Sequence, residues 1–203
     1  MSTRTDGTDT RPGLRAERRG ELLDVALRLF YEKGYERTSL QDIASEMGFT
    51  KAAIYYYADS KEELLVDIYR RIVEPAITSA REIADGPGSG AERFTRLVET
   101  HLRVFLANVE ANAVFEIQRD GLSPAAAETV RRHGREYGSI LSTVYSEGVA
   151  DGSLRRADPK VTVNAVLGLC NSVHRWFDPR GARTVDELVA ELTDLIGVGI
   201  DRR

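Results

Sequence analysis

Hydrophobic residues recur at helical spacing along most of the chain. From Leu22 to Phe30 the apolar side chains fall at i, i+1, i+4, i+7 and i+8, which is the buried face of an amphipathic helix. Gly34 follows, as is common just past a helix C-terminus. The same spacing returns after each polar or glycine-rich break. The pattern predicts about nine helices and no strand, and therefore an all-α fold.

Several predicted helices begin with capping residues. Thr38 and Gln41 have the spacing of a capping box, as do Ser60 and Glu63. Pro75 lies inside a long helical pattern, where it is expected to kink or break the helix. The other predicted N-caps are Thr50, Ser89, Ser123, Asp158 and Thr184.

The pattern also divides the chain into regions. Residues 1–13 carry almost no apolar side chains, so we expect a flexible tail there. Residues 14–59 contain short helical segments, which predict one small domain. Residues 60–203 contain longer ones, interrupted at 86–90 by a Gly- and Pro-rich linker, and predict a second domain.

Residues 39–57 combine a short helix, a tight turn and a second short helix. This is the spacing of a helix-turn-helix, whose second helix places its N-terminal residues at base edges in the major groove. Here Ala52 and Ala53 would allow close approach, and Lys51 could reach guanine acceptors or a phosphate. Thr38 and Thr50 would offer hydroxyl and N–H groups to phosphates. A plain helical hairpin has the same caps and glycines, so spacing alone leaves both interpretations open.

The residues from 22 to 65 resemble the DNA-binding domain of TetR-type transcriptional regulators. The resemblance rests on LLDVA (22–26), FYEKGY (30–35), TSLQDIA (38–44), MGFTKAAIYYY (47–57) and SKEELL (60–65). It implies an all-helical homodimer that binds double-stranded operator DNA, with a C-terminal ligand-binding and dimerisation domain. One departure is Ala58, where the family usually has Phe.

Matched position by position, the resemblance implies a set of operator contacts. Most would touch phosphate, while Ala52 and Ala53 would face bases. The expected DNA-binding residues are Thr38, Ser39, Thr50, Lys51, Ala52, Ala53, Tyr55, Tyr56 and Lys61.

The C-terminal region resembles a branch of the same family that senses acyl-CoA thioesters of fatty acids or steroid fragments. The similarity lies in residues 115–124 and 168–181. Such a ligand needs an apolar tunnel for the acyl chain and basic groups for its phosphates. The expected ligand contacts are Leu102, Phe105, Phe115, Arg119, Leu141, Tyr145, Asn171, Arg175 and Trp176.

Three alternatives stay open for this region. Aromatic side chains at helical spacing can belong to the core instead of a pocket. Arg175 and Trp176 can serve a dimer interface formed by the last two helices, at 159–177 and 185–200. The effector can also be a lipophilic or aromatic compound without CoA, as in a regulator of an efflux or another catabolic operon.

Charge modifies the DNA-binding hypothesis. Lys and Arg number 28 against 32 Asp and Glu, which gives a formal net charge of -4 and argues against a general polyanion binder. Between Gly48 and Tyr57, Lys51 is the sole charged residue. We therefore expect few phosphate contacts and a modest salt dependence of operator affinity.

Two remote alternatives remain, a protein-interaction module on a helical scaffold, which would bind no duplex, and an enzyme. Cys170 and His174 are four residues apart on one predicted helix, where a Cys–His pair could activate a thiolate. A lone cysteine is more often a small buried residue, and the three histidines lack metal-site spacing. We expect no enzyme activity, no metal, no cofactor and no membrane partner. The single cysteine also favours a cytoplasmic location.

Overall fold

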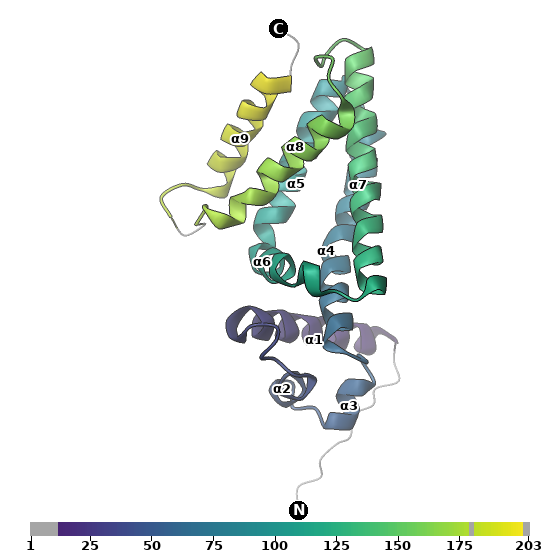
Figure 1. The fold of residues 1–203 in the computed structure, drawn as a ribbon, viewed down its shortest axis with the longest axis vertical. Helices are drawn as coiled ribbons and strands as arrows, with labels where there is room; N and C mark the ends of the chain where they lie inside the picture. The colour runs from purple at the N-terminus through teal and green to yellow at the C-terminus, as the bar shows by residue number, and fades with distance from the viewer. Residues whose placement is uncertain (1–11, 179–180, 201–203) are drawn as a thin grey trace, which may run out of the picture.

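The chain, in a computed structural model that describes residues 12–178 and 181–200, is helical throughout. The described residues form nine α-helices and two short 3-10 turns without a strand, which confirms the all-α prediction (Figure 1). The helices are α1 (Pro12–Lys33), α2 (Leu40–Glu46), α3 (Lys51–Tyr55), α4 (Lys61–Ala84), α5 (Gly90–Ala107), α6 (Val109–Gln118), α7 (Pro124–Ala150), α8 (Pro159–Ser172) and α9 (Val185–Ile200). The expected tail lies outside the described residues except for Pro12 and Gly13, which already belong to α1.

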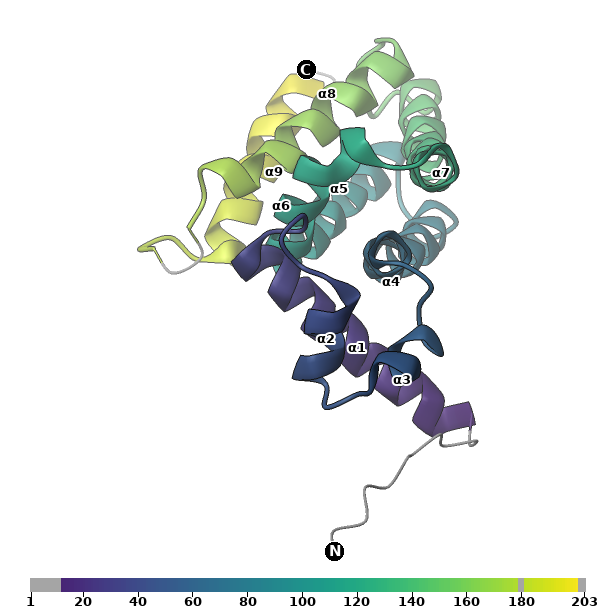
Figure 2. The ribbon, with the colours of Figure 1, turned by 60° about the horizontal axis from the view of Figure 1, so that its bottom comes forward.

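The first three helices pack with the start of α4 around one hydrophobic cluster. Figures 1 and 2 show α1, α2 and α3 together at the N-terminal end of the molecule. The fully buried side chains of this cluster include Leu22, Ala26, Leu29, Phe30, Ile43, Ala44, Ile54, Leu64 and Leu65. The face of α1 predicted from apolar spacing is therefore the face that is buried.

The N-cap of α2 differs from the prediction. Ser39 caps this helix: its hydroxyl accepts a hydrogen bond from the Asp42 N–H at 3.1 Å, and the Asp42 carboxylate accepts one from the Ser39 N–H at 2.8 Å. The predicted box of Thr38 and Gln41 is wrong by one residue. Thr38 is 2% exposed, and its hydroxyl donates to the Gly34 carbonyl at 2.9 Å. Both registers offer a good cap, so packing against the end of α1 decides between them.

The caps of α3 and α4 agree with the sequence. Thr50 accepts from the Ala53 N–H, and Ser60 accepts from the Glu63 N–H. Helix α4 passes through Pro75 without a break, so that part of the expectation is wrong. Pro75 lacks the N–H that would bond to the carbonyl of Arg71. Both residues are exposed, so the carbonyl left free faces solvent and the loss is tolerated.

A second hydrophobic cluster joins the rest of the chain. The later part of α4 packs against α5 and α7, α8 packs against α5 and α7, and α9 packs against α5 (Figure 1). Helix α4 therefore contributes Leu64, Leu65 and Ile68 to the first cluster and Ile77 and Ala80 to the second. None of the described helices is both long and apolar enough to cross a membrane.

Candidate nucleic-acid interface and ligand cavity

Helix α3 presents its N-terminal turn to solvent. Lys51 and Ala52 are exposed and Ala53 is half-buried, while Ile54 is fully buried in the N-terminal cluster. Ile54 therefore anchors the helix and fixes which face points outward. Lys51 forms no salt bridge with any residue that the structure describes. The turn thus offers two small side chains and an available cation.

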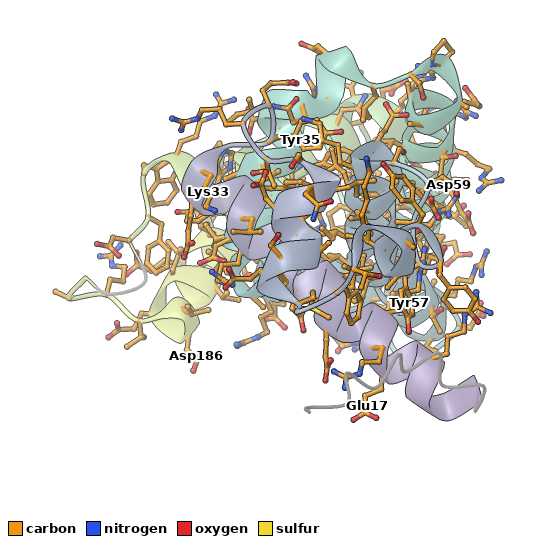
Figure 3. The ribbon with its side chains drawn as sticks, turned by 90° about the horizontal axis from the view of Figure 1, so that it is seen from below. Glu17, Lys33, Tyr35, Tyr57, Asp59 and Asp186 are labelled. Atoms are coloured by element: carbon orange, nitrogen blue, oxygen red, sulfur yellow. The ribbon has the colours of Figure 1, made fainter. Side chains whose placement is uncertain are left out.

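The three consecutive tyrosines lie in different environments, as expected for neighbours on one short helix. Tyr55 and Tyr56 are 50% and 46% exposed, whereas Tyr57 is buried and stacks on Phe49 with ring centroids 5.5 Å apart. The guanidinium of Arg15 lies 4.7 Å from the centroid of the Tyr56 ring. Figure 3 views this end of the molecule from below, with Glu17 near the start of α1 and Lys33 at its end.

Two residues that were expected to contact DNA form hydrogen bonds to backbone carbonyls within the N-terminal region of the chain. Thr38 is corrected from a phosphate contact to a buried residue, because its hydroxyl bonds to the backbone at the end of α1. Lys61 donates to the Tyr35 carbonyl at 2.8 Å and lies 4.2 Å from the centroid of the Tyr35 ring. It is part-buried, so its contact with phosphate stays a prediction.

Most other charges near these helices are paired. Arg18 pairs with Glu21 at 2.7 Å and Arg28 with Glu46 at 2.6 Å. At the N-terminus of α2, the hydrogen bonds from Ser39 lower the pKa of Asp42, so a carboxylate occupies that end of the helix. This carboxylate would repel a DNA phosphate at the N-terminus of α2. The first turn of α3 contains no acidic residue, and its N-terminus is therefore the better phosphate site.

Arg19 holds the junction between α3 and α4. Its guanidinium bonds to the Tyr57 carbonyl and to the Asp67 carboxylate, and lies 3.3 Å from Glu63. Ala58, the departure from the family pattern, is buried at this junction. The position of α3 on α4 therefore depends on a charged clamp from α1.

The second candidate site is a cavity of about 250 Å³ among α4, α5, α6, α7 and α8. Its walls are mostly aliphatic and aromatic, and no Lys, Arg, Asp or Glu lines it. The lining residues are Ile68, Tyr69, Ile72, Val73, Ala76, His101, Val104, Phe105, Ala111, Asn112, Phe115, Gly134, Tyr137, Leu167 and Asn171. Such a space suits an uncharged, largely apolar group.

The structure places three of the nine expected ligand residues on the cavity wall, namely Phe105, Phe115 and Asn171. Leu102, Leu141 and Tyr145 are fully buried in the core, where the Tyr145 hydroxyl donates to the Arg155 carbonyl. Arg119, Arg175 and Trp176 are exposed and do not line the cavity. The structure does not bring these six residues to the cavity, and their contact with the effector stays a prediction. Helical spacing marks apolar faces but does not show which neighbouring helix each one meets.

Asn171 belongs to a polar cluster on the cavity wall whose other members, His101 and Tyr137, were not predicted from the sequence. The His101 ring of α5 faces α8, where its Nε2 lies 2.9 Å from the Asn171 Oδ1. The centroid of the same ring lies 5.5 Å from that of the Tyr137 ring of α7. Burial lowers the pKa of His101, although its bond to Asn171 acts in the opposite direction. The available signal was that His101 lies four residues before Phe105, on a face that is otherwise apolar.

Helix α6 contacts both sites. Ala111 and Val114 belong to the N-terminal hydrophobic cluster, while Ala111, Asn112 and Phe115 line the cavity. Glu116, also on α6, forms an ion pair with Arg175 and lies 2.7 Å from the His174 Nε2. A group that enters the cavity therefore meets the helix on which α1 rests.

A third feature is an exposed apolar face on the last two helices. Val161 of α8 is 67% exposed, and Leu195 and Val198 of α9 are 60% and 65% exposed. Ala165 and Gly168, also exposed, add small side chains to α8. A patch of this kind marks an interaction surface.

Cys170 is placed as a core residue. It is buried, and burial raises the pKa of its thiol to about 12. His174 instead bonds to Glu116 and to the Asn171 carbonyl. We expect an alkylating reagent at pH 7 to label native Cys170 far more slowly than the same thiol in urea. Equal labelling rates, followed by mass spectrometry, would contradict this burial.

Comparison with known proteins gives matches over both regions. Residues 22–68 match the family described as "Bacterial regulatory proteins, tetR family". Residues 87–200, more than half of the chain, match "Tetracyclin repressor-like, C-terminal domain".

Similar proteins cover almost the whole chain. A TetR/AcrR-family transcriptional regulator from Thermobifida fusca is 44% identical, with 92% of this chain and 100% of that chain covered and a TM-score of 0.76. The transcriptional repressor KstR2 of Rhodococcus jostii is 28% identical over 185 residues, which is 90% of this chain and 91% of KstR2. AibR, solved with isovaleryl coenzyme A and operator DNA, is 23% identical and shares the fold, with a TM-score of 0.71 over 89% of this chain and 97% of AibR.

Proposed function

Because the chain belongs to the TetR family of bacterial transcriptional regulators, we propose that it is a ligand-responsive repressor of transcription. It binds a pseudo-palindromic operator as a homodimer in the cytoplasm and leaves the operator when a small hydrophobic effector, an acyl-CoA thioester, binds. KstR2 is named as a repressor, which supports the sign of regulation.

The observation that carries the DNA-binding role is the exposed first turn of α3. Thr50, Lys51 and Ala52 are exposed at its N-terminus, and Tyr55 and Tyr56 project from the same short helix. Lys51 can reach a guanine edge or a phosphate, and the tyrosine hydroxyls can donate to phosphates. With Arg18 and Arg28 paired to carboxylates, this surface makes few ionic contacts.

The exposed apolar face of α8 and α9 supports the homodimer. A two-fold axis would pair this face with itself and bury Val161, Leu195 and Val198 of both subunits. The dimer would then hold two α3 helices at a fixed separation, as two successive half-sites require.

An acyl group fits the charge-free cavity, and AibR provides a relative of the same fold that was solved with an acyl-CoA. The phosphates of CoA would have to lie outside this cavity. An adjoining groove shares Ile72, Ala76 and Val104 with the cavity wall and adds Arg71 and Thr100. Arg71 also pairs with Asp24 of α1 at 2.7 Å, so an anion held by Arg71 would compete with that pair.

The coupling between the two sites runs through α4 and α6. Glu62 near the start of α4 accepts hydrogen bonds from the Ser123 N–H at 2.7 Å and the Ser123 hydroxyl at 2.6 Å, which ties α4 to the N-cap of α7. An effector that shifts α6 or the start of α4 therefore shifts α1 and α3. An effector that binds this altered state better lowers operator affinity, and operator DNA lowers effector affinity by the same factor.

Lys51→Ala tests the DNA-binding role. The operator duplex is first selected from a random library with the wild-type protein. We expect the variant to bind this duplex about tenfold more weakly and to lower the slope of log affinity against log salt by about one, if Lys51 contacts a phosphate. Fluorescence anisotropy at several salt concentrations measures both quantities.

Arg156→Ala is the matched control. Arg156 is exposed in the loop between α7 and α8, at the end of the molecule opposite α3 (Figure 1). This variant should bind like the wild type. If Lys51→Ala also keeps the wild-type affinity and salt slope, Lys51 is not an operator contact.

A further inference from the structure

The cavity carries three uncharged polar side chains whose hydrogen-bonding capacity is only partly used. His101 of α5, Tyr137 of α7 and Asn171 of α8 all line it. One hydrogen bond links two of them, from the His101 Nε2 to the Asn171 Oδ1 at 2.9 Å. Because that amide oxygen accepts, Nε2 carries the proton and the His101 Nδ1 is an acceptor. Tyr137 is 8% exposed, and its hydroxyl makes no hydrogen bond to a described residue but is not fully shielded from solvent.

The unused groups are therefore the Tyr137 hydroxyl, the Asn171 amide N–H groups and the His101 Nδ1. A ligand that displaces water from these groups without replacing its hydrogen bonds loses binding energy, so a ligand that supplies a hydrogen-bond partner gains more than an apolar ligand of equal size. Ile72, Val73 and Val104 offer only apolar contact. The other two polar side chains on the wall, Tyr69 and Asn112, already donate to the Val130 and Phe105 carbonyls.

Size and charge restrict the ligand further. A cavity of about 250 Å³ holds roughly the volume of eight waters, which is the size of one six-membered ring with a substituent. No Lys, Arg, Asp or Glu lines it, and burial lowers the pKa of His101, so a carboxylate inside would be a charge without a charged partner. The ligand group in the cavity is therefore compact and neutral.

We propose that His101, Tyr137 and Asn171 recognise a neutral oxygen, a ketone or a hydroxyl, on a compact apolar part of the effector. This inference rests on the proposed function, since it takes the cavity to be the effector site. It narrows the effector from any acyl group to an oxygenated one of about ring size. A ketone would accept from Tyr137 and Asn171, and a hydroxyl could also donate to the His101 Nδ1.

The test uses cyclohexanone, cyclohexanol and methylcyclohexane, which have the same number of non-hydrogen atoms. Methyl NMR titrations of the full-length protein follow Ile72, Val73 and Val104, so binding is located in the cavity. Tyr137→Phe removes one hydroxyl and keeps the ring. We expect this variant to bind cyclohexanone and cyclohexanol about five- to tenfold more weakly than the wild type. Its affinity for methylcyclohexane should be unchanged or higher.

Tyr145→Phe is the matched control, because Tyr145 is a buried tyrosine on the same helix that does not line the cavity. It should change no probe affinity. The proposal is overturned if Tyr137→Phe changes all three probes by the same factor, or if neither oxygenated probe binds the wild type. If the probes behave as expected but no acyl-CoA releases the operator duplex, the proposed acyl-CoA effector is wrong. The proposed preference of the cavity for a neutral oxygen is then retained. If an acyl-CoA releases the duplex while Tyr137→Phe does not discriminate among the probes, the polar cluster is not the recognition element.

Discussion

Val161→Asp combined with Leu195→Asp is expected to give a monomer that binds the operator duplex at least 100-fold more weakly than the wild type. Both side chains are largely exposed on the apolar face of α8 and α9. In a two-fold interface each substitution occurs twice, and unpaired carboxylates would be buried there. A monomer can bind only one half-site and loses the factor of about 10² to 10⁴ that linkage of two binding units provides.

Sedimentation velocity and fluorescence anisotropy on the same samples measure assembly and DNA binding. Ile117→Asp is the control, because Ile117 is 76% exposed on α6 and lies outside the proposed interface. It should remain dimeric. A double variant that stays dimeric at micromolar concentration would place the dimer interface elsewhere.

The second large effect is expected from Gly90→Ala. Gly90 begins α5 and packs backbone to backbone against Gly148 of α7. A Cβ at residue 90 would lie 2.1 Å from the Gly148 Cα and 2.2 Å from its nitrogen, and backbone atoms cannot move aside as a flexible side chain can. We expect a cost of about 3 kcal/mol or more in the free energy of unfolding, and a melting temperature lower by roughly 10 °C.

Gly138→Ala is the matched control on α7. A Cβ there meets no atom within 4 Å, so removing a helical glycine should stabilise the protein by about 0.5–1 kcal/mol. Thermal unfolding followed by circular dichroism compares the two variants. Equal melting temperatures for Gly90→Ala and the wild type would show that α5 and α7 are not in backbone contact.

The helices and their caps were largely predictable because they depend on local chemistry. Ile54 is buried, and Thr50 and Ser60 cap their helices, as spacing alone indicates. The exception is the start of α2, because Thr38 and Ser39 are both good N-cap residues. The contact of Thr38 with the end of α1 decides that Ser39 is the cap. That contact spans the turn between α1 and α2 and leaves no periodic signal.

The cavity was less predictable because it depends on which helices meet. On α5, Leu102 faces the core while Phe105 faces the cavity, although both are apolar and only three residues apart. Tyr137 and Tyr145 lie two turns apart on α7, yet only Tyr137 lines the cavity. Arg119 and Arg175, the basic residues expected to contact CoA phosphates, are exposed outside the cavity, where the phosphates of a bound CoA would also lie.

The central claim is that a ligand in the cavity lowers the affinity of the dimer for its operator. The direct measurement is a titration of the selected duplex complex with isovaleryl-CoA, medium- and long-chain acyl-CoAs and steroid-derived acyl-CoAs, followed by fluorescence anisotropy, with free CoA as the control. The same titration of Ala76→Phe, which places a ring in the cavity, tests the site. We expect at least one acyl-CoA to weaken wild-type operator binding tenfold or more, free CoA to have little effect, and Ala76→Phe to bind the duplex but not to respond. Operator affinity that stays unchanged across the whole panel, or an equal response from Ala76→Phe, would contradict the account.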